Sequence, residues 1–282
     1  MEDDTSLLVI VLDCNIYSWG TSSPPLINTS KNNYIGFSKF LEHVMVFINA
    51  YLMLNQENQI ALISSKIGQS SFIFPETVEQ LEQEETQTEN NIQNITLQSQ
   101  ILKRLQKINI EVNNDQQDII NSSFSAALSM ALCYINRIRK ESPNLKPRIL
   151  VFNISPDVSS QYISVMNCIF SAQKQSIPVD SCILSQTDST FLQQASHLTN
   201  GIYLKPHKQE LLSQYLLTTF LLDTQSRKSL AYPNLKSVDY RASCFCHKKI
   251  VDIGFVCSVC LSIFCNHFSS CSTCGTKFSL KI

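Results

Sequence analysis

Two patterns of hydrophobic positions follow one another along most of the chain. A continuous aliphatic run at residues 7–12 and a mostly apolar segment at 148–154 predict buried, central parallel strands, because a strand that is buried on both faces carries apolar side chains at successive positions. Apolar residues that recur at three- and four-residue steps in 35–54 and 124–138 predict long amphipathic helices instead. This alternation indicates an α/β fold.

Shorter segments continue the alternation. Further strands are expected at 59–64, 71–74, 178–184 and 201–204, and further helices at 159–175, 189–198 and 208–222. Each parallel return of the chain requires a crossover connection, so helices are expected on both faces of the sheet. The sequence therefore predicts a doubly wound, mostly parallel sheet.

Two stretches interrupt the pattern and divide the chain. Residues 76–100 are rich in Glu, Gln, Asn and Thr, and their six glutamates are accompanied by no lysine or arginine, which predicts a solvated, mobile insertion. Residues 225–241 contain Pro233 and little periodicity, which is typical of a linker. The expected organisation is an α/β domain at 1–224, this linker, and a small C-terminal module at 242–282.

The small module contains seven of the eleven cysteines. Four of them form two C-x-x-C pairs: Cys257 with Cys260, and Cys271 with Cys274. Two thiolates at this spacing curl around one metal ion, and two such pairs complete a tetrahedral zinc shell. The sequence therefore predicts a C4 zinc site made by these four residues.

The remaining ligand-type residues of the module leave a second zinc site open. Its candidate ligands are Cys244, Cys246, His247 and Cys265, which would interleave with the first site as in a RING-like cross-brace. Two features weigh against this site, because the Cys244 to Cys246 spacing is shorter than a standard knuckle and Cys265-x-His267 mixes ligand types. His267 is expected to be an exposed polar residue. The predicted metal content is one zinc ion, with a second left open.

Composition and charge narrow the function classes. The acidic N-terminus and the short apolar run behind it do not fit a secretion signal, so zinc is favoured over disulfide pairing. With a net charge of −1, the chain as a whole has no electrostatic attraction to nucleic acid or to a membrane surface. The longest apolar stretch is taken to be 211–222, which is shorter than the ~20 residues that span a bilayer. We expect a soluble protein in a reducing compartment.

The first predicted strand ends in Asp13, and here the chain resembles a von Willebrand A domain. The metal-binding loop of that fold follows strand one as D-x-S-x-S, whereas Asn15 and Tyr17 stand at the serine positions of this chain. Asn15 offers an amide oxygen, but a tyrosine is too long to replace a serine hydroxyl. We expect a degenerate, empty loop and no bound magnesium. Asp157 would either complete such a site or act as an ordinary cap.

Several stretches together resemble one family: LLVIVLDCN, ALCYINRI, FSAQKQSIPVDSCIL and VDYRASCFCHKKIVDIGFVCSVCLSIFC. Over nearly its whole length, apart from the insertion after Phe74, the chain resembles the von Willebrand A plus zinc-finger subunit of the core of transcription and repair factor IIH (TFIIH). The resemblance implies a non-enzymatic nuclear subunit acting in RNA polymerase II initiation and nucleotide excision repair. It also implies that the main partner is the other von Willebrand A/RING-like subunit of that core, with helicase subunits reached through the complex.

The resemblance also assigns residues. The four cysteines of the C-x-x-C pairs match the C4 finger of the family, and Cys244, Cys246 and Cys265 match further cysteines there. DNA contact is expected only indirectly, and no small-molecule substrate is expected. The predicted mechanism is scaffolding, with the rim of the sheet as a docking surface and zinc stabilising the small module.

Two other function classes remain open from the sequence. A RING-like E3 ubiquitin ligase would need both zinc sites and an exposed apolar groove. A nucleic-acid-binding zinc ribbon would use the lysines of the module, although surface lysines are usually solvated. An ordinary enzyme is not indicated, because the chain has six glycines, no glycine-rich phosphate loop and no recognisable pair of nucleophile and base.

Overall fold

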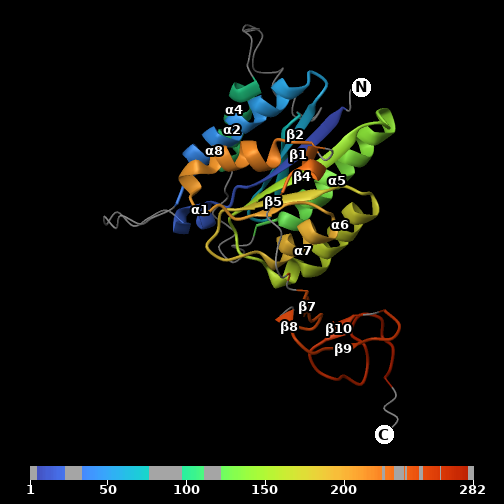
Figure 1. Ribbon diagram of the computed structural model, residues 1–282. Helices are drawn as coiled ribbons and strands as arrows, with labels where there is room; N and C mark the ends of the chain where they lie inside the picture. Colours follow the sequence, from blue (N-terminus) through green and yellow to red (C-terminus); the bar gives the residue numbers. More distant parts are fainter. Residues whose placement is uncertain are drawn as a thin grey trace, which may run out of the picture.

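The computed structural model consists of an α/β domain followed by a small cysteine-rich module (Figure 1). It describes residues 5–22, 34–75, 97–110, 122–223, 226–231, 238, 240–247, 250–260 and 262–278. Residues 76–96 of the predicted insertion, and residues 225, 232–237 and 239 of the predicted linker, lie outside the described residues.

A six-stranded sheet forms the centre of the α/β domain, in the order β3-β2-β1-β4-β5-β6. Its strands are β1 Ser6–Asp13, β2 Gln59–Ser65, β3 Ser70–Phe74, β4 Lys146–Asn153, β5 Val179–Ile183 and β6 Tyr203–Leu204. Within this sheet β3 pairs antiparallel with β2, and the other neighbours pair parallel. The prediction of a mostly parallel, doubly wound sheet is therefore confirmed.

Helices cover both faces of the sheet (Figure 1). One face carries α2 Phe37–Leu54, α4 Leu97–Ile110 and α8 Leu212–Tyr215, and the other carries α5 Phe124–Glu141, α6 Tyr162–Lys174 and α7 Thr190–Leu198. The central strand β1 contributes alternate side chains to the two cores, Leu8 and Ile10 to the first and Val9 and Val11 to the second. This double burial explains why the run is apolar at every position.

Helix α2 is the most apolar of the described helices, which corrects the expectation that residues 211–222 form the longest apolar stretch. Its length and composition alone would allow it to cross a membrane. Its buried side chains, among them Phe40, Val44 and Ile48, belong instead to the core on one face of the sheet. An amphipathic core helix of this kind passes the same hydropathy test.

The structure also corrects three other expectations for the α/β domain. A short helix, α1 Ile16–Ser22, follows β1 directly, and α4 begins at Leu97 inside the predicted insertion. The helix expected at 208–222 is divided into a 3-10 turn at Gln209–Leu211, α8, and a π turn at Leu216–Phe220. At its start the buried Gln209 side chain donates to the Leu184 carbonyl at 2.7 Å, a tertiary contact that sequence periodicity does not reveal.

The small module contains two short hairpins, β7 Ala242–Ser243 with β8 Ile250–Val251, and β9 Phe255–Val256 with β10 Ile263–Phe264. Its buried hydrophobic cluster within the described residues consists of Cys257, Phe264 and Cys271, and Cys244 is also buried. So few buried side chains cannot stabilise a module of this size without a further constraint. The seven cysteines of the module are the candidates for that constraint.

Candidate metal centres

Four cysteine sulfurs meet in the second half of the small module. Cys257 and Cys260 lie in the turn between β9 and β10, and Cys271 and Cys274 lie in a later turn. Their sulfurs all lie within 4.8 Å of one another, with 3.7 Å between Cys257 and Cys274 and 3.5 Å between Cys260 and Cys271. A tetrahedral zinc ion with Zn–S bonds of about 2.3 Å separates its sulfurs by about 3.8 Å. The spacing and the all-sulfur ligand set fit zinc.

Both C-x-x-C turns have the same backbone geometry. The Cys257 N–H donates to the Ser262 carbonyl at 2.9 Å, and the Cys271 N–H donates to the Thr276 carbonyl at 2.8 Å. Gly275 follows the last cysteine with a φ of 74°, in the left-handed region that favours glycine. Each turn therefore points its two sulfurs towards the same point.

Ser262 and Thr276 support the C4 group and were not predicted. The Ser262 hydroxyl lies 3.1 Å from the Cys260 sulfur, and this hydroxyl together with the Ser262 N–H lowers the pKa of Cys260 to about 6. The Thr276 hydroxyl, also at 3.1 Å, lowers the pKa of Cys274 in the same way. Such hydrogen bonds favour the thiolate, which is the form that binds a metal. In the sequence, the hydroxyl residue that stands two positions after the second cysteine of each C-x-x-C pair could have indicated these two supporting residues.

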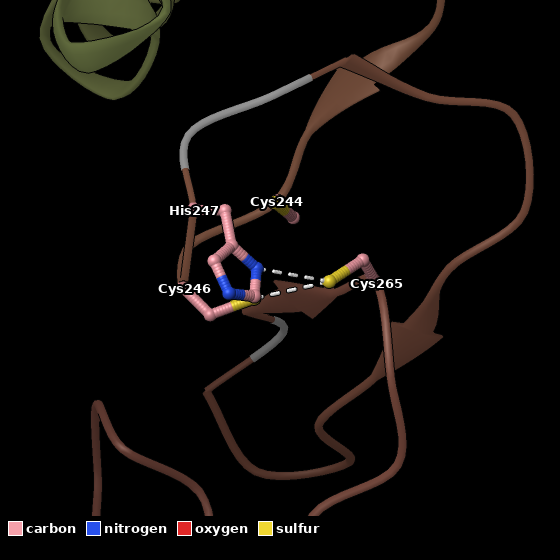
Figure 2. A group of neighbouring side chains, drawn as sticks. All are labelled: Cys244, Cys246, His247 and Cys265. Atoms are coloured by element: carbon pink, nitrogen blue, oxygen red, sulfur yellow. Dashed lines mark hydrogen bonds between the residues drawn. The ribbon is translucent and has the colours of Figure 1, made fainter.

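The second group consists of Cys244, Cys246, His247 and Cys265 (Figure 2). The first three come from the loop between β7 and β8, and Cys265 follows β10. The Cys265 sulfur lies 3.4 Å from the Cys246 sulfur and 3.2 Å from Nδ1 of His247, and all the ligand atoms lie within 4.8 Å of one another. These spacings also fit one zinc ion with three sulfur ligands and one nitrogen ligand.

Crowding of thiols has an electrostatic consequence in this group. The hydrogen bond with Cys246, followed by burial and the neighbouring cysteines, raises the pKa of Cys265 to about 11. Several thiolates therefore do not form together easily without a cation, and a bound divalent ion reverses this balance because coordinated thiols lose their protons. The residues present fit a metal in this respect as well.

The two groups alternate along the chain, as a cross-braced arrangement requires. Cys265 of the second group lies between the two C-x-x-C pairs of the first group in sequence. The Cys244 to Cys246 spacing is shorter than that of a standard knuckle, but His247 from the same loop supplies a further ligand atom to the group. His267 belongs to neither group, and its ring packs near Phe255 and Phe278 with centroid distances of 5.8 and 6.1 Å.

The loop after β1 does not fit a magnesium ion. The Asp13 side chain is buried and accepts hydrogen bonds from the backbone N–H groups of Asn15 at 3.2 Å and Ser155 at 2.8 Å. The side-chain oxygen of Asn15 accepts from the Tyr17 N–H at 3.1 Å, and the Tyr17 side chain is exposed. The Asp13 carboxylate thereby joins the end of β1 to the segment after β4, and the Asn15 oxygen is used within its own loop. The absence of bound magnesium stays a prediction.

Asp157 acts at the start of α7. Its two carboxylate oxygens accept hydrogen bonds from the hydroxyls of Ser189 at 2.6 Å and Thr190 at 2.9 Å, and from the Phe191 N–H at 3.1 Å. A carboxylate at a helix N-terminus satisfies free N–H groups and interacts favourably with the helix dipole. Of the two roles considered for Asp157, the structure therefore supports the cap.

Replacing Asp13 with asparagine should change how stability depends on pH. Burial raises the pKa of Asp13 above its ordinary value, so the folded chain holds this proton more tightly than the unfolded chain does. The contribution of the carboxyl to folding is therefore complete below the ordinary pKa and declines as the pH rises through the raised pKa. Relative to the wild type, D13N should gain stability in urea unfolding as the pH rises above the ordinary aspartate pKa of about 4. Parallel stability curves would contradict this assignment.

Comparison with known proteins gives consistent matches. The family model Transcription factor Tfb4 matches residues 5–275. The chain is 65% identical to General transcription factor IIH subunit 3 of Dictyostelium discoideum, over all of this chain and 91% of that protein. It is 42% identical to General transcription and DNA repair factor IIH subunit TFB4 of Arabidopsis thaliana, over 98% of this chain and 90% of that protein.

Among solved structures, the crystal structure of the TFIIH p34 N-terminal domain aligns with a TM-score of 0.62 and 26% identity, over 77% of this chain and 99% of that chain. The strand order and the two helical layers are those of a von Willebrand A-like fold, as expected from the sequence. The fold and the full-length relatives therefore agree.

Proposed function

Because the chain belongs to the Tfb4 family of transcription factors, we propose that it is a structural subunit of the general transcription and DNA repair factor IIH. The chain would act in transcription initiation by RNA polymerase II and in nucleotide excision repair. The observation that carries this proposal is the 65% identity over the whole chain to a protein named as a subunit of that factor. The location that follows from this role is the nucleus.

The role we propose for the chain is non-catalytic. Each cysteine group offers four protein ligands to its ion, which leaves no coordination position for water or a substrate. The carboxylate of Asp13, at the rim where this fold can hold a metal, is occupied by backbone donors. Both features favour a structural role for the metal groups and a docking role for the rim.

The partners we propose are other TFIIH subunits. Direct contact would be made with the other von Willebrand A/RING-like subunit of the core, and helicase subunits and DNA would be reached through the complex. Support comes from the small module, where Ile253, Phe255 and Val259 are 85%, 50% and 67% exposed. Large apolar side chains that remain exposed on a small module are typical of a protein contact.

Neither alternative function gains support from the relatives. Their names assign them to TFIIH, and none of the names reported above describes a ubiquitin ligase or a nucleic-acid-binding ribbon protein. The second cysteine group meets one requirement of a cross-braced ligase module, but such a group is equally consistent with a structural module.

We expect two zinc ions per chain. Elemental analysis of the purified full chain should give a zinc-to-protein ratio near two, because each cysteine group brings four ligand atoms within 4.8 Å of one another. Cys246→Ser should lower the ratio to about one. Cys133→Ser is the matched control, since Cys133 is an exposed cysteine on α5 outside both groups. A wild-type ratio of one would contradict the second site.

Depletion tests the proposed function. Removing the chain from a nuclear extract with an antibody should abolish both promoter-dependent transcription and dual incision of damaged DNA. Adding back the purified complex that contains the chain should restore both activities. Extracts that lose the chain but keep both activities would contradict the proposal.

A further inference from the structure

The chain is fixed to the α/β domain where the predicted linker begins. Arg227 lies in the 3-10 turn Ser226–Ser229, and its guanidinium donates two hydrogen bonds to the carboxylate of Asp180 on β5, at 2.9 and 2.7 Å. Its Nε donates to the Leu222 carbonyl at 3.2 Å, and its backbone N–H donates to the Asp223 carbonyl at 3.2 Å. The chain therefore leaves the α/β domain at a defined point.

The chain contacts the α/β domain again where the predicted linker ends. The hydroxyl of Tyr240 forms a hydrogen bond with Nδ1 of His197, which lies in the last turn of α7. The two rings meet edge to face, with 5.7 Å between their centroids and 77° between their planes. Both side chains lie at the surface, and Tyr240 is 53% exposed. The two ends of the linker are thus both held by the α/β domain.

The residue that follows Tyr240 is bound to the small module. The guanidinium of Arg241 pairs with the carboxylate of Asp252 at 3.0 Å, and Asp252 lies between β8 and β9. Strand β7 begins with the next residue, Ala242. In Figure 1, β7 and β8 accordingly lie next to the α/β domain, below α7. Because the module starts directly after Tyr240, a contact that holds Tyr240 also holds the module.

The second contact matters because of the length of chain between the two. Residues 230–239 separate the turn that contains Arg227 from Tyr240. A segment of this length spans about 30 Å when extended, so a module anchored only at Arg227 could take many positions. A hydrogen bond and an edge-on ring pair each add a small preference, and together they favour the docked position by a factor on the order of ten.

We propose that the pair of Tyr240 and His197 is a clamp that holds the small module in one position against the end of α7. Helix α7 then acts as a spacer between the rim of the sheet and the module. Asp157 caps the helix at the rim, where it accepts from the hydroxyl of Thr190. His197 lies about 10 Å along the helix axis from Thr190. The clamp therefore keeps the rim and the module at a fixed separation.

A fixed separation has a consequence for docking, and this consequence rests on the proposed function. The rim and the exposed apolar side chains of the module are the two surfaces that we propose as contacts for other TFIIH subunits. A subunit that contacts both surfaces meets them already in position, so less conformational freedom is lost on binding. The clamp itself does not depend on that function, because both of its residues belong to this chain.

Nuclear relaxation of the full chain tests the clamp. Rotational correlation times would be measured for the backbone amides of β1 and β4, and separately for those of β9 and β10. In the wild type the two sets should agree, because a clamped module tumbles with the α/β domain. In Tyr240→Ala the correlation time of β9 and β10 should fall well below that of β1 and β4, because a tethered module reorients by itself. Separate tumbling in the wild type, or common tumbling in Tyr240→Ala, would overturn the proposal.

Tyr17→Ala is the matched control, because Tyr17 is also 53% exposed and lies on α1 at the rim. Its module should tumble with the α/β domain as in the wild type. Separate tumbling in this variant would overturn the proposal, since the effect would then not depend on the contact with His197.

His197→Ala keeps the test independent of any change in the module. This variant removes the partner on α7 and leaves the linker and the module intact, so it should free the module as Tyr240→Ala does. The double variant should add nothing further, because both substitutions remove the same contact. A module that stays clamped in His197→Ala would overturn the assignment of the clamp to this pair. All these measurements use the isolated chain, so a failed clamp leaves the proposed function intact, and a failed assignment to TFIIH leaves the clamp intact.

Discussion

Replacing Cys257 with serine is expected to unfold the small module while the α/β domain stays folded. Cys257 is fully buried, and it belongs both to the C4 group and to the buried hydrophobic cluster of the module. Structural zinc contributes about 10–16 kcal/mol of binding free energy in modules of this size, and this energy is folding energy. Hydrogen exchange of the full chain should show loss of protection across residues 250–278 and unchanged protection in β1 and β4.

Cys133→Ser provides the control for this prediction. Cys133 is exposed on α5, so its replacement should leave the zinc content and the exchange pattern unchanged. Retained protection of the module in Cys257→Ser would show that zinc at the C4 group does not hold the module together.

A second large effect is expected for Arg227, which lies in a 3-10 turn at Ser226–Ser229. Its guanidinium forms two parallel hydrogen bonds with the carboxylate of Asp180 on β5, at 2.9 and 2.7 Å. The two side chains are only 9% and 1% exposed. Arg227→Ala would leave a buried carboxylate without this partner, which should lower the free energy of unfolding by about 3 kcal/mol or more. Urea unfolding of the full chain measures this difference.

Arg241→Ala is the matched control, because Arg241 pairs with Asp252 at 3.0 Å on an exposed surface. An exposed ion pair contributes about 0–1 kcal/mol, so this variant should unfold almost as the wild type does. Equal effects of the two substitutions would mean that the pair of Arg227 and Asp180 is not a buried anchor.

Short-range patterns made much of this molecule predictable from its sequence. Consecutive aliphatic residues predict that β1 is buried on both faces, and two C-x-x-C spacings predict the C4 group. In both cases the residues that act together are close in the chain, so local periodicity or spacing is sufficient.

Long-range contacts explain what the sequence did not reveal. The sequence left the second zinc site open, because the proximity of Cys265 to Cys246 and His247 is set by the fold of two hairpins. Arg227 falls in a segment that reads as a linker, and its partner Asp180 is 47 positions away.

Affinity purification tests the assignment to TFIIH most directly. The full chain would carry a tag at its own genomic locus and would be isolated at physiological salt, and its partners would be identified by mass spectrometry. The account predicts that the other von Willebrand A/RING-like subunit and the helicase subunits of TFIIH are recovered in amounts comparable to the chain. Recovery of the chain with none of these subunits would contradict the assignment.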